Sequence, residues 1–150
     1  MTVPYSEELV VRWADVDFNG HMKNTAYLDV CVDVRLHYFA RHGFTAVEFA
    51  RLRIGPVVRR DEADYFRELR LLEPFTVDLE LAGKSPDGSR FRLQNRFLRR
   101  DGELVARVVS TGGWLDLEAR KLIAAPERLG ELLDALPRAE GSQDLPSSLR

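Results

Sequence analysis

The chain of 150 residues has very little cysteine and no long apolar run. Its single cysteine, Cys31, cannot form an intramolecular disulfide, which excludes a small disulfide-stabilised domain. No segment approaches the roughly 20 consecutive apolar residues that cross a bilayer, so we expect no membrane span. The N-terminal residues show no basic region followed by an apolar stretch, as a secretory signal would. These absences predict a cytoplasmic protein.

The chain also has little net charge and lacks one common catalytic motif. Its formal charge of −2 at pH 7 argues against a general nucleic-acid binder, so no nucleic-acid partner is expected. There is no Gly-x-Ser-x-Gly sequence and no histidine evidently paired with Cys31, so an acyl-enzyme on serine or cysteine is not expected. The hydrophobic content of 45% suits one soluble domain with one core.

Two periodic segments lie on either side of the most informative stretch of the chain. Residues 7–14 alternate between two sets of side chains in the manner of a β-strand. From about Thr25 to Arg41 the spacing of apolar residues indicates a helix, with Asn24 as its N-cap and Gly43 as its stop. Because apolar residues cover most of this helix, we expect it to be buried on most sides.

In the second half of the chain, the sequence pattern predicts strands joined by tight turns. Extended segments are expected at residues 57–66, 75–84, 91–97 and 103–117. Hairpin turns containing Asp87-Gly88 and Asp101-Gly102 connect the last three of them. This pattern predicts an α+β fold with a single antiparallel sheet of about five strands wrapped around one long central helix. Residues 1–136 are expected to form this domain, and residues 137–150 a disordered tail.

The connection between the first strand and the helix gathers groups suited to acid–base chemistry. It contains Asp15, Asp17, an Asn-Gly turn, His21 and Asn24. The N-terminus of a helix favours negative charge, as develops on a carbonyl oxygen during a reaction. From the residues alone, a turn carboxylate that accepts backbone hydrogen bonds is favoured over a catalytic role for Asp17. For Asp15, a structural bond to Arg12 or to the backbone is favoured over chemistry.

Other polar residues near this connection have more than one interpretation. His21 is consistent with positioning substrate or activating water, and also with packing inside the turn. Asn24 is compatible with capping the helix while its main-chain N–H polarises a carbonyl. Asp29, Asp33 and His37 share one helix face at a spacing that metal ligands use. No further ligand accompanies them, so no metal is expected.

Residues 11–28 contain the pattern Asp-x-Asp-x-x-Gly-His-x-x-Asn, beginning at Asp15. This stretch resembles the signature of the hot-dog-fold acyl-CoA thioesterases, specifically the 4-hydroxybenzoyl-CoA thioesterase-like group. Later segments around Gly55-Pro56, Glu73-Pro74 and Gly113-Trp114 fall where that family has them. The resemblance implies a hot-dog fold, in which a sheet surrounds a long helix, and at least a homodimer, with a homotetramer of two dimers as the larger alternative.

The resemblance also implies an activity, the hydrolysis of an acyl-CoA thioester to a free acid and coenzyme A. Coenzyme A is part of the substrate, so no cofactor is expected. In this family the residue matching Asp17 acts as nucleophile or general base, and the main-chain N–H matching Asn24 is the oxyanion donor. Two alternatives stay open, an acyl-carrier-protein thioester as substrate and a non-catalytic acyl-CoA-binding protein. A hydratase on this fold is disfavoured by the motif.

The remaining expected contacts concern substrate binding. Gly20 and Tyr27, which belong to the motif region, are expected next to the substrate. Coenzyme A carries phosphate groups, which arginine and lysine bind. The candidate residues for this contact are Arg59, Arg60, Lys84 and Arg90. Each of these four is also compatible with an ordinary solvated charge.

Overall fold

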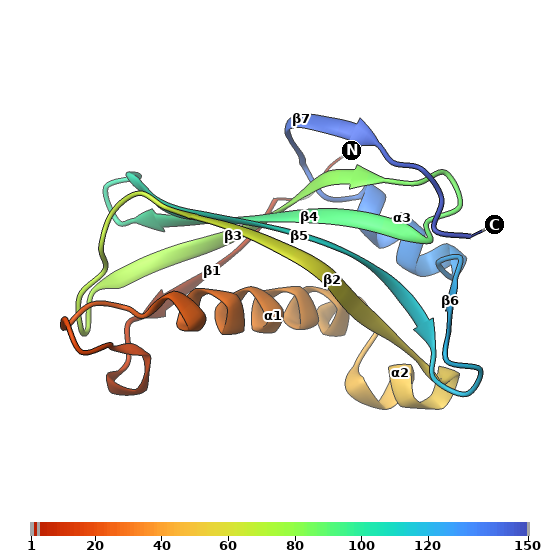
Figure 1. Cartoon of the computed structure of the whole chain (residues 1–150), viewed down its shortest axis with the longest axis horizontal. Coiled ribbons are helices and arrows are strands. Elements are labelled where there is room, and N and C mark those ends of the chain that lie inside the picture. Colours follow the sequence, from red (N-terminus) through yellow and green to blue (C-terminus); the bar gives the residue numbers. More distant parts are fainter. Residues whose placement is uncertain (1, 3, 150) are drawn as a thin grey trace.

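The computed structural model describes residues 2 and 4–149 and shows a strongly curved sheet around one long helix (Figure 1). Along the chain the elements are β1 (Tyr5–Val10), the short 3-10 helix η1 (Trp13–Asp15), α1 (Asn24–Arg41), α2 (Ala46–Leu52), β2 (Ile54–Tyr65), β3 (Pro74–Lys84), β4 (Arg90–Arg99), β5 (Leu104–Asp116), β6 (Lys121–Ile123), α3 (Glu127–Asp134) and β7 (Arg138–Asp144). The predicted long helix and main strands are confirmed.

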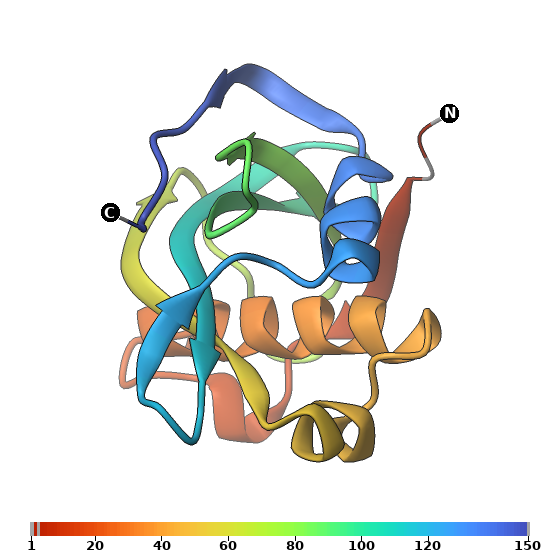
Figure 2. The same ribbon diagram turned by 90° about the vertical axis from the view of Figure 1, so that its right-hand side faces the viewer.

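The sheet has the strand order β1-β3-β4-β5-β2, and all neighbours along this path are antiparallel. Two further strands lie off this path, because β6 pairs with β5 and β7 pairs parallel with β3. Seen along the molecule, the strands curl over α1, and β7 lies far from that helix (Figure 2). The predicted α+β hot-dog arrangement is therefore confirmed, with two more strands than expected.

The alternation of buried and half-buried side chains along β3 explains how the sheet packs against the helix. In β3, alternate side chains face the core and are almost completely buried, namely Phe75, Val77, Leu79 and Leu81. The residues between them are half-buried on the other face of the sheet, as expected for a strand with one face on the core. From the helix side, Val34, Tyr38 and Phe39 fill the same core.

The helix α1 is not buried on most sides within one chain, contrary to the prediction. Val32 and Leu36 remain 43% and 42% exposed, so one apolar stripe of the helix faces outward. Its end is as predicted, because Gly43 follows Arg41 and His42 with a left-handed φ of 95°. No helix of the described residues has the length and apolar character needed to cross a bilayer.

The start of α1 differs from the prediction by one residue. Lys23 is the N-cap, without a side-chain cap, and Asn24 is the first helical residue. The physical reason lies in the preceding backbone, where Lys23 N donates to Asp15 O at 2.8 Å and holds Lys23 extended. Asn24 is thereby moved into the first turn, where its side chain does not serve as the cap.

The C-terminal residues also differ from the prediction. Instead of a disordered tail from residue 137, the chain forms β7 beside the second half of β3. Ala139 and Leu145 are buried, and Leu145 packs close to Gly83, where a Cβ atom would lie only 3.0 Å from the leucine side chain. The burial of Ala139 and Leu145 and the pairing of β7 with β3 thus order this segment, although its composition is polar. The last residue of the predicted tail, 150, lies outside the described residues.

Candidate active site

The chain folds into a closed turn between β1 and α1. Val16 and Met22 form an isolated β-bridge, and Asp17 N donates to His21 O at 2.8 Å. Within this loop Gly20 N donates to Asp17 O at 3.1 Å, and Gly20 adopts a φ of 79°. Glycine reaches this left-handed conformation without steric cost. The motif residues Asp17, Gly20 and His21 are therefore brought together, immediately before the first turn of α1.

The side chain of Asp17 is exposed and only half engaged. Its Oδ1 atom accepts hydrogen bonds from Asn19 N at 2.8 Å and from His21 N at 3.2 Å. The other oxygen, Oδ2, accepts no hydrogen bond from any residue in the described part of the chain. The turn interpretation and the chemical one are thus compatible, because one oxygen shapes the loop and the other stays accessible.

The neighbouring carboxylate, Asp15, has a structural role, as the sequence indicated. Asp15 is buried and accepts two side-chain hydrogen bonds from Arg12, at 3.0 Å from Nε and 2.8 Å from the terminal nitrogen. Arg12 N donates to the same carboxylate at 3.0 Å. These hydrogen bonds hold the pKa of Asp15 below its usual range. Both oxygens of Asp15 are engaged, so this carboxylate is not a candidate for catalysis.

The start of α1 provides a donor next to this turn. As the first helical residue, Asn24 has a main-chain N–H with no intrahelical acceptor, and it donates to none of the described residues. Asn24 O accepts a hydrogen bond from the Tyr65 hydroxyl at 3.1 Å. This bond connects the end of β2 with the start of α1. The site therefore combines a partly engaged carboxylate with a helix N-terminus that favours anions.

An apolar hollow lies beside Asp17. It has a volume of about 470 Å³, and its lining consists of Trp13, Val16, Asp17, Phe18, Gly20 and Leu71. The Trp13 side chain is 82% exposed, and Phe18 is fully exposed. Exposed aromatic side chains that share one hollow with a carboxylate are typical of a binding surface rather than of a folding core.

The imidazole of His21 contacts a different loop. His21 Nε2 lies 3.0 Å from Glu68 Oε2, in the connection between β2 and β3. Glu68 was not predicted from the sequence, nor was Leu71, which lines the hollow from the same connection. No local signal could have identified them, because they meet the motif only after α1 and β2 have folded back.

Tyr27 supports the site from inside the core. It is almost completely buried and packs edge-to-face against Tyr65 and Phe97, with ring centroids 5.2 Å and 5.0 Å apart. Burial raises the pKa of Tyr27 to about 12. The predicted contact of Tyr27 with substrate stays a prediction, and its observed contacts are with the aromatic core.

The four candidate phosphate ligands do not gather around Asp17 within one chain. Arg59 and Arg60 are exposed on β2, the outermost strand of the main sheet. Lys84 Nζ lies 2.8 Å from Asp134 Oδ2, and Arg90 Nε donates to Ser148 Oγ at 3.1 Å. The turn that joins β3 to β4 lies at the opposite end of the sheet from the turn between β1 and α1 (Figure 1).

Cys31 is the buried thiol that the helical pattern predicted. It is 1% exposed, and burial raises its pKa to about 12. A thiol with so high a pKa is almost entirely protonated near neutral pH and is a poor nucleophile.

Known proteins are similar to this chain in sequence and in structure. A protein of Agrobacterium fabrum (strain C58 / ATCC 33970), L-carnitine dehydrogenase/betainyl-CoA thioesterase, is 29% identical over 129 residues. That match covers 83% of this chain and 25% of the relative, so the chain spans about a quarter of the relative's length.

Solved structures share the architecture. A Staphylococcus aureus protein solved in complex with CoA has a TM-score of 0.82 at 22% identity, covering 93% of this chain and 89% of that chain. A 1,4-dihydroxy-2-naphthoyl-CoA thioesterase from Synechocystis has a TM-score of 0.78 at 16% identity, covering 88% and 96%. At these identities the likeness establishes the fold alone. The family model of the thioesterase-like superfamily matches residues 11–133, and this chain belongs to that superfamily.

Proposed function

We propose that this protein hydrolyses acyl-CoA thioesters to a free acid and coenzyme A, with Asp17 as the reacting carboxylate. The observation that carries the proposal is an accessible Asp17 oxygen in the closed turn directly before α1, whose first residue, Asn24, has a main-chain N–H with no acceptor among the described residues. Membership of the thioesterase-like superfamily supports the same reaction. A cytoplasmic location is part of this proposal.

Two routes are consistent with a carboxylate at this position. As nucleophile, Asp17 adds to the thioester carbonyl, the C–S bond breaks, coenzyme A leaves as thiolate and takes up a proton, and water then hydrolyses the mixed anhydride. As general base, Asp17 takes a proton from a water molecule that attacks the carbonyl directly. Both routes consume one water and place negative charge on the carbonyl oxygen, which the Asn24 N–H and the helix dipole stabilise.

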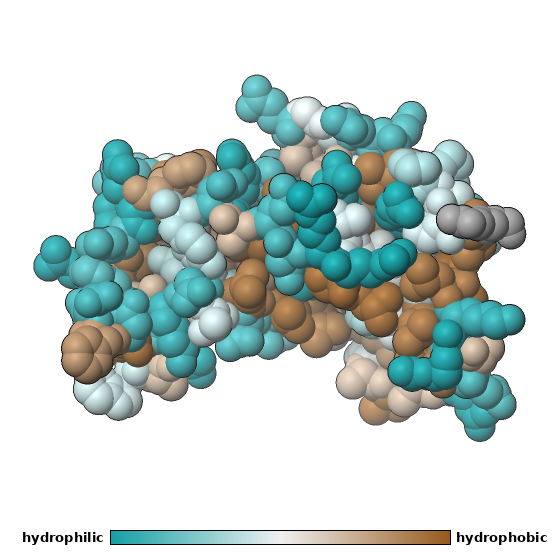
Figure 3. All heavy atoms as spheres, viewed as in Figure 1, coloured by the Kyte–Doolittle hydropathy of each residue, from teal (hydrophilic) through white to brown (hydrophobic). Residues whose placement is uncertain are grey.

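A homodimer formed along β2 is the minimum assembly in this proposal. One edge of this strand of 12 residues has no partner among the described strands, and open edges favour pairing with another chain. Figure 3 shows apolar side chains gathered across the middle of this face, over β2 and α1. Val32 and Leu36 of α1 and Val58 of β2 are exposed apolar residues of these two elements.

Antiparallel pairing of two β2 strands would cover that surface and place Arg59 and Arg60 of each copy near the new interface. Two such dimers packed together would give the homotetramer, which is the alternative assembly. Light scattering at micromolar concentration tests the assembly. A fully active monomer would contradict it.

The proposal also concerns which acyl group the hollow beside Asp17 accepts. Trp13 and Phe18 offer aromatic faces in a hollow whose single charged lining residue is Asp17. Aromatic faces bind both apolar groups and quaternary ammonium cations. A betainyl group carries such a cation next to its thioester, and the Agrobacterium relative is named for this substrate. Betainyl-CoA is therefore one candidate substrate, alongside aryl and short alkyl acyl-CoA compounds.

The decisive experiment measures released thiol with a panel of thioesters. The panel contains betainyl-CoA, its neutral isostere 3,3-dimethylbutanoyl-CoA, 4-hydroxybenzoyl-CoA, straight-chain acyl-CoA compounds and an acyl-carrier-protein thioester. Asp17→Asn serves as the inactive control. Turnover only with the carrier-protein thioester would favour the first alternative, and tight acyl-CoA binding without turnover would favour the non-catalytic one. Either result would contradict the proposed activity.

A further inference from the structure

The connection between β2 and β3, residues 66–73, forms one wall of the candidate site although the sequence motif does not include it. Met22 N donates to Leu69 O at 2.8 Å, and His21 and Arg70 form an isolated antiparallel bridge. Leu69 is fully buried. This segment therefore pairs with the second half of the Asp17 turn, as a short strand would, and a shift of the segment would move His21 and Met22 as well.

Glu68 gives the same segment a direct contact with a titratable group. Its carboxylate Oε2 lies 3.0 Å from His21 Nε2, while its side chain is 62% exposed. Glu68 makes no ion pair with Arg or Lys in the described part of the chain. A carboxylate that accepts the Nε2–H proton fixes the imidazole tautomer, which leaves Nδ1 with the lone pair that can accept a proton.

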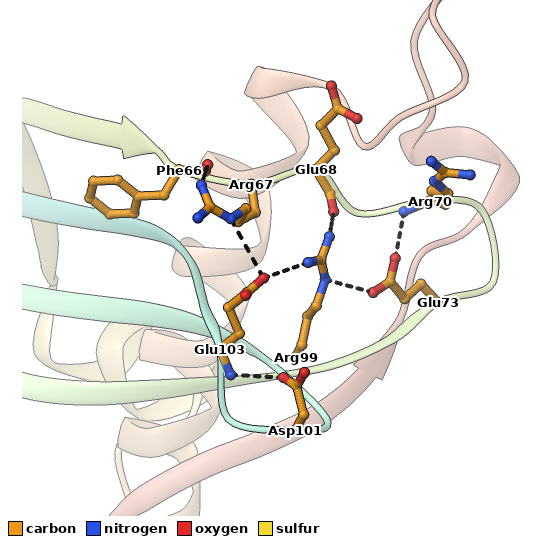
Figure 4. Close-up of polar contacts among 8 residues, drawn as sticks. All are labelled: Phe66, Arg67, Glu68, Arg70, Glu73, Arg99, Asp101 and Glu103. Atoms are coloured by element: carbon orange, nitrogen blue, oxygen red, sulfur yellow. Dashed lines mark hydrogen bonds and ion pairs between the residues drawn. The ribbon is translucent and has the colours of Figure 1, made fainter.

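Arg99 of β4 holds this segment in place (Figure 4). Its guanidinium donates to Glu73 Oε2 at 3.0 Å, to Glu103 Oε1 at 2.6 Å and to the backbone oxygen of Glu68. Glu73 in turn accepts a hydrogen bond from Arg70 N at 3.0 Å. One planar cation therefore bridges both ends of the connection and the β4–β5 hairpin, and lysine lacks the donor geometry to replace all three bonds.

We infer that Glu68 and Arg99 are positioning residues for hydrolysis, acting through His21: Arg99 fixes residues 66–73, and Glu68 on this segment orients the imidazole as a base for water. The inference rests on the proposed function. In the nucleophile route of that proposal, His21 Nδ1 takes one proton from the water that hydrolyses the mixed anhydride on Asp17, and the imidazolium passes that proton to the coenzyme A thiolate released in the first step. The Glu68 carboxylate stabilises the imidazolium and does not itself become protonated.

The first experiment tests Glu68. In Glu68→Gln we expect kcat to fall on the order of 10-fold or more, with KM within about twofold, because binding surfaces are unchanged while the base is misoriented. Nitrogen-15 NMR of the imidazole should report the Nε2–H tautomer in the wild type and a mixture in the variant, with His21→Asn identifying the signals. Glu118→Gln is the matched control, since Glu118 is also an exposed glutamate in an ion pair, 3.2 Å from Arg53.

The second experiment tests Arg99. In Arg99→Lys we expect the Met22 amide, which donates to Leu69 O, to exchange with solvent on the order of 10-fold faster, while amides of the β3–β4 core keep their protection. The value of kcat should fall together with this protection. Arg92→Lys is the control on the same strand, because Arg92 donates to Thr111 Oγ1 at 3.3 Å, away from residues 66–73.

The outcomes separate this inference from the proposed function. A wild-type tautomer and wild-type kcat in Glu68→Gln would overturn the role of Glu68. Loss of stability in Arg99→Lys with unchanged Met22 exchange and unchanged kcat would overturn the role of Arg99 and leave it a purely structural residue. If the wild type hydrolyses no thioester, the proposed function fails and the catalytic role fails with it, while NMR and exchange still decide whether the two residues position His21.

Discussion

Three turns of this protein contain an aspartate followed by a glycine with positive φ, and the carboxylates of two of them, Asp17 and Asp87, differ sharply in their hydrogen bonds. Asp87 accepts hydrogen bonds from Ser85 Oγ at 2.8 Å, from Ser89 N at 3.0 Å and Ser89 Oγ at 2.7 Å, and from Ser147 Oγ. These bonds hold the pKa of Asp87 well below its usual range. Asp17 accepts two backbone bonds on one oxygen and none from the described residues on the other. Both oxygens of Asp87 accept hydrogen bonds, which connect separate segments of the chain. One oxygen of Asp17 accepts none from the described residues, so this oxygen is available to react.

The largest expected effect is a difference in turnover between variants of the two aspartates. Asp17→Asn should reduce thioester turnover on the order of 10²-fold or more, because an amide is neither nucleophile nor base. Asp87→Asn should keep turnover close to the wild type and instead lower the melting temperature. Steady-state kinetics and a melting curve for each variant test this comparison. If both variants lost activity to a similar degree, the difference in hydrogen bonding would not distinguish a catalytic carboxylate from a structural one.

A second, smaller effect concerns the donor beside Asp17. Because Asn24 is the first helical residue, an aspartate there should stabilise α1 or leave its stability unchanged. The same carboxylate would oppose negative charge on the carbonyl oxygen, so Asn24→Asp should lose on the order of 10-fold in kcat. Asn24→Ser should stay active. Equal activity of the two variants would place the reacting oxygen elsewhere.

A third effect compares the glycines of the two turns. Gly20 and Gly88 have φ values of 79° and 71°, so alanine is strained at either position. The strain alone costs about 1–2 kcal/mol. A Cβ atom at Gly20 would meet no atom of the described residues within 4 Å, whereas at Gly88 it would approach the Ala125 Cβ to 2.7 Å. Urea unfolding should therefore show a larger loss of stability for Gly88→Ala, and the opposite order would contradict the described packing.

The smallest expected effect is a dependence of stability on pH. The pKa of Asp87 is lower in the folded state, so its stabilisation is complete above the unfolded value of about 3.9. That stabilisation is lost as the pH falls through the lowered folded pKa. The difference in melting temperature between wild type and Asp87→Asn should be largest above pH of about 4 and shrink in stronger acid. A difference independent of pH would show that the carboxylate charge is not what holds Ser147.

Local patterns predicted the parts of the structure whose causes are local. The alternation from Phe75 to Leu81 marks the face of β3 that packs on the helix, and this was confirmed. The bond between Arg12 and Asp15 was also confirmed, because these residues lie one turn apart in the chain. The N-cap prediction was wrong by one residue, since the bond from Lys23 N to Asp15 O belongs to the turn and not to the helix pattern.

Features that depend on contacts between distant segments were not predictable in the same way. The polar composition after residue 137 indicated disorder, yet Leu145 is buried and Ser147 bonds to Asp87. The roles inferred for Glu68 and Arg99 depend on how the connection after β2 folds back onto the Asp17 turn. The coenzyme A contacts expected of Lys84 and Arg90 remain predictions.

The bond between Met22 N and Leu69 O also bears on when the site appears during folding. It joins two segments separated by all of α1 and β2, and Arg99, which holds the second segment, follows later still. A chain emerging from the ribosome exposes the whole motif long before β4 has been synthesised. Until then the turn lacks the backbone that shapes it, because distant contacts form only after the loop between them has closed. Asp17, the carboxylate proposed to react, should therefore be ordered among the last parts of the molecule, so that a nascent chain carries the motif without a finished site.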